Sequence, residues 1–145
     1  MSPRTFEITM DSNVDDVVVA SAMLRSLFDQ LRLPQRDAEQ MELCLMEALV
    51  NTVRHAYKNR SGNPVILRFR LGKADIAFEV EDHGSGCEKK DLEEAIRKAT
   101  AFDPTDPETL AEGGRGMLII HEVMTEWDYF SEDGRNVLTM SKRID

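Results

Sequence analysis

Three short segments of this sequence combine residue types that can bind a nucleotide. Residues 47–57 read EALVNTVRHAY, residues 82–86 read DHGSG, and residues 113–116 read GGRG. In the first segment Glu47 and Asn51 are four residues apart, so a carboxylate and an amide would share one face of a helix. The glycines of the third segment precede an apolar run, and a glycine-rich helix start presents unpaired N–H groups to a phosphate. As an ordered set, the three segments predict a nucleotide pocket.

The polar side chains that follow Glu47 along the predicted helix have two interpretations. Asn51 offers a neutral oxygen to Mg²⁺, and Glu47, one turn earlier, can act as a general base. Arg54 can meet a phosphate, whereas Lys58 is expected to face solvent. The alternative is an ordinary solvated helix face, whose side-chain pairs are worth about 0.2–0.5 kcal/mol each.

The second and third segments also have two interpretations each. Asp82 ends an apolar run, where its carboxylate can accept a hydrogen bond from an exocyclic amine such as that of adenine. Gly84 and Gly86 would let the backbone approach the base closely. The alternative is a plain turn in which Asp82 caps a hairpin. The glycines of residues 113–116 can bind phosphate or merely form a loop, and they are not a P-loop because no Gly-Lys-Ser/Thr follows.

The elements that would position these residues follow from hydrophobic periodicity and turn signals. Strands are expected at residues 5–9, 65–71, 75–82, 126–131 and 135–142, and helices at 12–31, 34–59, 91–99 and 117–125. Residues 100–114 hold two prolines and two glycines without a clear period, so a loop is expected there. Helices grouped against such strands predict an α+β fold, a two-layer sandwich with the helices on one face of a mixed, largely antiparallel sheet.

Composition indicates a single globular domain spanning residues 1–145, with 41% apolar and 31% charged residues. The chain has 27 acidic residues against 18 Lys and Arg, a net charge of −9. This charge opposes contact with a phosphate backbone, so no direct nucleic-acid partner is expected.

Targeting signals and cysteine pairs are not expected. The first residues, MSPRTFEITMDSN, lack the apolar core of a signal peptide. No later run approaches the ~20 apolar residues of a membrane span, so we expect a cytoplasmic protein without a membrane segment. Cys44 and Cys87 have no CxxC spacing, and both are expected to be reduced thiols.

Most of the chain resembles the GHKL ATPase superfamily. EALVNTVRHAY resembles its N box, DHGSG its first glycine box and GGRGMLII its second, and the whole is most similar to the small anti-sigma-factor serine kinases of bacterial partner-switching systems. The resemblance implies a Bergerat-type ATP-binding sandwich, an ATP lid over residues 100–112 and a homodimer. Glu47 would be the general base and Asn51 the Mg²⁺ ligand. The other nucleotide contacts implied at matching positions are Arg54, Asp82, Gly84, Gly86, Gly114, Arg115 and Gly116.

The function that this resemblance implies is phosphotransfer between proteins. The kinase would use Mg-ATP to phosphorylate a serine on a STAS-domain anti-anti-sigma protein, and a sigma factor would be its alternative partner. Because 145 residues leave no room for a histidine-bearing dimerisation hairpin or a transducer domain, we expect the small kinases rather than larger relatives. The alternative is a nucleotide-sensing adaptor that binds partners and transfers nothing. Glu47 favours the enzyme, because an adaptor needs no base.

Overall fold

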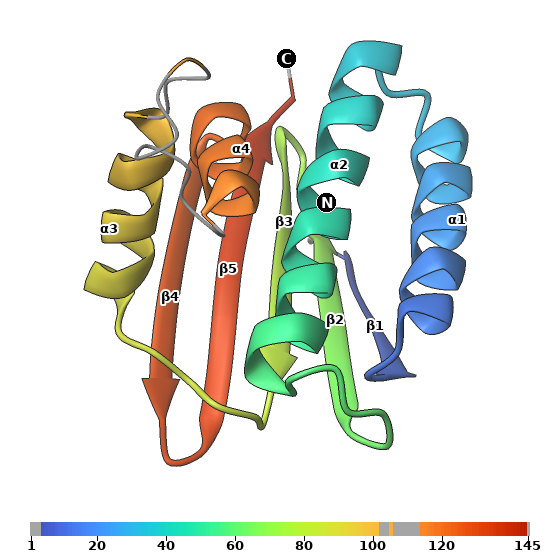
Figure 1. The fold of residues 1–145 in the computed structure, drawn as a ribbon. Helices are drawn as coiled ribbons and strands as arrows, with labels where there is room; N and C mark the ends of the chain where they lie inside the picture. Colours follow the sequence, from blue (N-terminus) through green and yellow to red (C-terminus); the bar gives the residue numbers. More distant parts are fainter. Residues whose placement is uncertain (1–3, 102–104, 106–113, 145) are drawn as a thin grey trace.

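The fold is a five-stranded sheet with helices on one face (Figure 1). A computed structural model describes residues 4–101, 105 and 114–144. The strands follow the order β1-β2-β3-β5-β4 across the sheet. Their bounds are Arg4–Asp11 for β1, Pro64–Leu71 for β2, Asp75–Asp82 for β3, Glu126–Glu132 for β4 and Arg135–Arg143 for β5.

Every pairing between these strands is antiparallel, so the predicted two-layer α+β sandwich is confirmed with a fully antiparallel sheet instead of a mixed one. The register pairs Leu67 with Val80 and Phe78 with Met140, which directs these apolar side chains toward the helices. Because side chains alternate along a strand, the polar positions between them line the opposite face. That second face carries no helix in Figure 1 and is called the open face below.

Four α-helices cover the apolar face, with α1 near the β1 edge and α3 near the β4 edge (Figure 1). They are α1 (Val14–Gln30), α2 (Gln35–Asn51), α3 (Lys89–Thr100) and α4 (Arg115–Val123). Asn13 caps the first helix, because its side chain accepts a hydrogen bond of 2.8 Å from the Asp16 amide.

The prediction of one continuous helix from Pro34 to Asn59 is wrong beyond Asn51. Residues Thr52–Ala56 form a π-helical turn, η1, in which the Tyr57 amide donates to the Thr52 carbonyl at 3.1 Å. The i→i+5 bonding is wider than that of an α-helix, so the α-helical spacing of side chains does not continue past Asn51. Lys58 has a φ of 53° and lies beyond the helix.

The core fills the space between the sheet and the helices. The edge of the Phe28 ring packs against Phe78, with 6.2 Å between ring centroids. Other large, fully buried side chains come from both layers and include Leu24, Met41, Leu45, Leu49, Leu67, Ile120 and Met140. Cys44 and Cys87 are both free, as expected.

A hydrogen bond joins the last turn of α4 to strand β4. The indole N–H of Trp127, on β4, donates to Nδ1 of His121, on α4, at 3.0 Å. An accepting Nδ1 requires the neutral imidazole with its proton on Nε2. This contact fixes the C-terminal half of α4 to the edge of the sheet.

The predicted lid over residues 100–112 and the glycine at position 113 lie largely or wholly outside the described residues. None of the described helices is both long and apolar enough to cross a membrane.

Candidate nucleotide-binding site

The candidate site lies where the last turn of α2 meets the first turn of α4. Glu47 and Asn51 are half-buried on α2, and Gly116 is buried on α4. A Cβ atom at Gly116 would lie 2.6 Å from Glu47 Oε2 and 3.0 Å from Asn51 Nδ2. Glycine at position 116 therefore lets α4 approach these two side chains without displacing them. The structure brings the first and third sequence segments together, as the predicted pocket requires.

Helix α4 begins against α3 through Gly114. This residue has a φ of 82°, in the left-handed region that favours glycine, and its Cβ would lie 2.6 Å from the Ala95 carbonyl oxygen on α3. The first intrahelical bond runs from the Leu118 amide to the Gly114 carbonyl, at 2.9 Å. The amides that precede Leu118 form the positive end of the helix dipole, and Arg115 adds an exposed basic side chain there.

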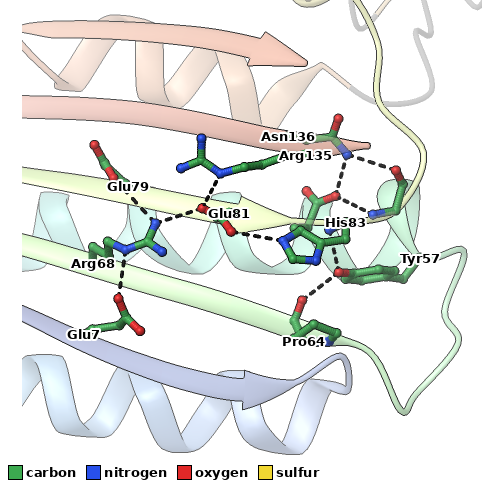
Figure 2. Close-up of polar contacts among 11 residues, drawn as sticks. Glu7, Tyr57, Pro64, Arg68, Glu79, Glu81, His83, Arg135 and Asn136 are labelled. Atoms are coloured by element: carbon green, nitrogen blue, oxygen red, sulfur yellow. Dashed lines mark hydrogen bonds and ion pairs between the residues drawn. The ribbon is translucent and has the colours of Figure 1, made fainter. Parts of the chain in front are cut away.

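Asp82 ends β3 on the helix-covered face, with only 6% of its surface exposed. Its Oδ1 accepts hydrogen bonds from Asn136 Nδ2 at 2.7 Å and from the Gly84 amide at 2.9 Å (Figure 2). Burial raises the pKa of Asp82, and these two hydrogen bonds oppose the rise. Oδ2 has no hydrogen-bond partner among the described residues. Asp82 is therefore a fixed acceptor whose bond to the Gly84 amide fits the turn interpretation, and its contact with a base stays a prediction.

Asn136, on β5, was not predicted from the sequence. Its Nδ2 also donates to the Gly84 carbonyl at 3.0 Å, and its Oδ1 accepts from the Ser131 hydroxyl at 2.6 Å. A Cβ atom at Gly86 would clash with the Ser131 and Asn136 side chains, so glycine is required there. The register places Asn136 directly opposite Asp82. Pairing of β3 with β5 was the signal that could have identified it, and local sequence does not reveal that pairing.

The loop after Asp82 is held against the π-helical turn. A Cβ atom at Gly84 would lie 2.6 Å from the Ala56 carbonyl carbon. The Tyr57 hydroxyl accepts a hydrogen bond of 2.7 Å from the His83 amide and donates one of 2.6 Å to the Pro64 carbonyl (Figure 2). Tyr57 thus holds the ends of β2 and β3 together beside the site, a role that the sequence motif alone did not suggest.

Arg54 is exposed on η1. No hydrogen bond or ion pair joins its guanidinium to another described residue, and its contact with a phosphate stays a prediction.

The donor set fits a magnesium–nucleotide complex better than an isolated metal ion. Among the described residues, no three His, Cys, Asp or Glu side chains gather to hold a metal. Asn51 supplies one neutral oxygen, and Mg²⁺ completes its octahedral shell with phosphate oxygens and water where protein ligands are few. Asn51 Nδ2 lies 3.0 Å from the position of a Cβ atom at Gly116, so this amide side chain is next to the start of α4.

Comparison with known sequences identifies the family of the chain. Residues 10–142 match the Histidine kinase-like ATPase domain family. The serine-protein kinase RsbW of Oceanobacillus iheyensis is 26% identical over 139 residues, which are 95% of this chain and 85% of the relative. RsbW of Bacillus thuringiensis (strain Al Hakam) is 27% identical over 95% of this chain and 84% of its own length.

Solved structures with the same fold include a Mycobacterium tuberculosis protein with RsbU and RsbW domains and the SiaB–SiaC complex of Pseudomonas aeruginosa. The first has a TM-score of 0.67 at 15% identity, covering 97% of this chain and 32% of that one. The second has a TM-score of 0.62 at 15% identity, covering 94% of this chain and 89% of that one. At these identities the likeness concerns the fold, while the matched sequence identifies the family. The chain belongs to the Histidine kinase-like ATPase domain family.

Proposed function

We propose that residues 1–145 form a single-domain, ATP-dependent protein serine kinase of a partner-switching system. It transfers the γ-phosphate of ATP to a serine on a STAS-domain anti-anti-sigma protein, and it binds a sigma factor in the alternative complex. The names of the RsbW relatives support a serine kinase. The observation that carries the proposal is the approach of Gly116 to Glu47 and Asn51, which brings the proposed base and the proposed magnesium ligand next to the start of α4.

In this proposal Glu47 is the general base. It takes the proton of the acceptor serine while the serine oxygen bonds to the γ-phosphorus, and the bond from that phosphorus to the bridging oxygen breaks to release ADP. Asn51 would hold Mg²⁺, which would offset the negative charge of the phosphates. The half-buried position of Glu47 next to Gly116 suits a base that must reach the phosphate end of the pocket.

The remaining contacts divide between the two ends of the nucleotide. Asp82 Oδ2 accepts a hydrogen bond from the adenine amine, and Gly84 and Gly86 let the loop approach the base. At the other end Gly114, Arg115 and Gly116 receive the phosphates at the start of α4. Arg54 contacts the phosphates only if its exposed side chain turns toward α4.

The assembly that we propose is a cytoplasmic homodimer that binds proteins and no nucleic acid. The net charge of −9 supports the exclusion of nucleic acid. The dimer and the cellular location are expectations drawn from the resemblance and from the sequence.

The test is to mix the purified protein with Mg-ATP and a STAS-domain protein encoded near it, and to assay the STAS protein for phosphoserine. The proposal expects one phosphoserine per STAS domain and ADP in equal amount. A protein that binds Mg-ATP but phosphorylates no cognate STAS partner would instead be a nucleotide-sensing adaptor.

A further inference from the structure

A charged cluster on the open face of the sheet surrounds Glu81, the residue before Asp82. Although no helix covers this face, Glu81 is only 4% exposed. Its Oε1 accepts hydrogen bonds from Arg68 Nη1 at 2.9 Å and Arg135 Nε at 2.8 Å, and its Oε2 lies 3.0 Å from His83 Nε2 (Figure 2). Side chains from β2, β5 and the loop after β3 therefore converge on one carboxylate.

The three partners keep Glu81 ionised in spite of its burial. Burial alone would raise the pKa of Glu81, but hydrogen bonds from the three partners outweigh it and lower the pKa to about 2. Arg68 extends the cluster, because its Nε also donates to Glu7 on β1 at 2.9 Å and its Nη1 lies 3.7 Å from Glu79. A buried carboxylate with this many partners is costly to disrupt, since any lost partner leaves charge uncompensated.

The Glu81 cluster and the adenine end of the candidate site lie on opposite faces of the same part of the sheet. Glu81 and Asp82 are consecutive on β3 and point to opposite faces, and so do Arg135 and Asn136 on β5. Arg135 binds Glu81 on the open face, and Asn136 binds Asp82 on the helix-covered face. The same two strand ends are thus joined once on each side of the sheet, as Figure 2 shows.

The residue after Asp82 is held in the same way. His83 contacts Glu81 through its imidazole, and its amide donates to the Tyr57 hydroxyl. The main chain on both sides of Asp82 is therefore anchored. Glu81 connects three segments, because β2, β5 and the loop after β3 each contribute a side chain that contacts its carboxylate.

We propose that Glu81, together with Arg68 and Arg135, is a positioning residue for adenine recognition. From the open face it fixes the end of β3, so that Asp82 Oδ2 stays in position to accept a hydrogen bond from the adenine amine. This inference rests on the proposed nucleotide site. Recognition by a single carboxylate oxygen requires placement to about 0.5 Å. Without the Glu81 charge, Arg68 and Arg135 repel each other across β3, and the strand end that carries Asp82 shifts.

The test compares binding of Mg-ATP and Mg-GTP by the full chain and by Glu81→Gln. The inference expects ATP affinity to fall roughly tenfold, within the range that sub-ångström misplacement causes, while GTP affinity changes little, so the ATP-to-GTP preference falls. Glu7→Gln is the matched control, because it removes a partner of Arg68 on the same face without touching Glu81. Glu7→Gln should keep the preference of the parent.

A second pair of variants covers the case in which Glu81→Gln does not fold. Arg135 is half-exposed, so Arg135→Met should fold and lower the preference, while Arg135→Lys, which can still reach Glu81, should restore most of it. If these variants and Glu81→Gln lower only the melting temperature and keep the parent preference, the cluster is purely structural and the inference is overturned. A parent that binds neither nucleotide overturns the proposed function and, with it, the inference.

Discussion

Glu47 is the side chain whose replacement best separates phosphotransfer from nucleotide binding. Glu47→Gln keeps the size of the side chain but removes the group that takes the serine proton. We expect transfer to a STAS partner to fall by ~10²–10⁴-fold, the usual contribution of a general base, with nucleotide affinity nearly unchanged. Phosphoserine formation and equilibrium binding measure the two effects separately.

The control for this variant is Glu39→Gln, which changes an exposed carboxylate two turns earlier on α2. It should transfer phosphate at the parent rate. A Glu47→Gln variant that does the same would remove Glu47 from the mechanism.

Asn136 should contribute to both stability and base recognition. Asn136→Ala removes the donor of the buried hydrogen bond to Asp82 Oδ1 and also removes the contacts with Ser131 and Gly84. The loss of a buried hydrogen-bond partner costs about 1–3 kcal/mol, which urea unfolding would detect. ATP affinity should fall in parallel, whereas an unchanged affinity would show that Asp82 needs no help from β5.

Among individual residues, the sequence identifies those whose role depends on a local motif and misses those whose role depends on the pairing of strands. Glu47, Asn51 and Gly116 were predicted from their spacing and from the helix start, and they do lie together. Asn136 was missed because its role exists only when β5 lies beside β3.

At the level of elements, α4 and the loop after β3 each make a close contact through a glycine. The two glycines differ in whether the neighbouring atoms belong to a side chain or to the backbone. The nearest neighbour of a Cβ at Gly116 is the carboxylate end of Glu47, which can rotate aside. The nearest neighbours at Gly84 are backbone atoms of Ala56, which cannot move without shifting η1.

We therefore expect opposite outcomes for two matched variants. Gly116→Ala should fold with near-parent stability, because alanine suits a helix, but should transfer phosphate slowly, because Glu47 is displaced. Gly84→Ala should lose about 1–3 kcal/mol of unfolding free energy through overpacking. Urea unfolding and the phosphoserine assay distinguish them. Equal losses of stability in both variants would contradict the difference between side-chain and backbone neighbours.

The elements themselves were largely predictable, because the alternation of β2 and β3 and the periodicity of α1 are strong local signals. The π-helical turn was not, since its buried residues, Thr52 and Val53, fit the buried stripe of an α-helix equally well. The wider turn is defined by the backbone bond between Tyr57 and Thr52, which leaves no signature in residue type.

For the whole molecule, nucleotide binding should appear as stabilisation of the fold. At ~100 times its dissociation constant, a ligand adds about 2.7 kcal/mol to the unfolding free energy. Thermal melts with Mg-ATP should therefore show a higher melting temperature than melts with Mg²⁺ alone. Asn51→Ala should lose most of this shift through the metal. No rise with Mg-ATP in the parent would contradict the nucleotide site itself.

The acid stability of the molecule should reflect Glu81. Its pKa is lowered from 4.5 to about 2 in the folded state, so its contribution is complete above pH 4.5 and is lost as the pH falls toward 2. In urea unfolding, Glu81→Gln should be less stable than the parent at pH 6, and the difference should shrink as the pH falls below 4.5. A difference that is constant with pH would show that the Glu81 charge is not what stabilises the fold.

The hydrogen bond between Trp127 and His121 gives this protein a built-in optical signal. Trp127 is the only tryptophan in the chain, so all indole emission comes from the side chain that donates to Nδ1 of His121. His121 lies on α4, whose first turn carries Gly116 beside Glu47. Displacement of α4 would break this bond and change the polarity around the indole. We therefore expect tryptophan fluorescence to report movement of α4, without a label and without altering a residue of the pocket.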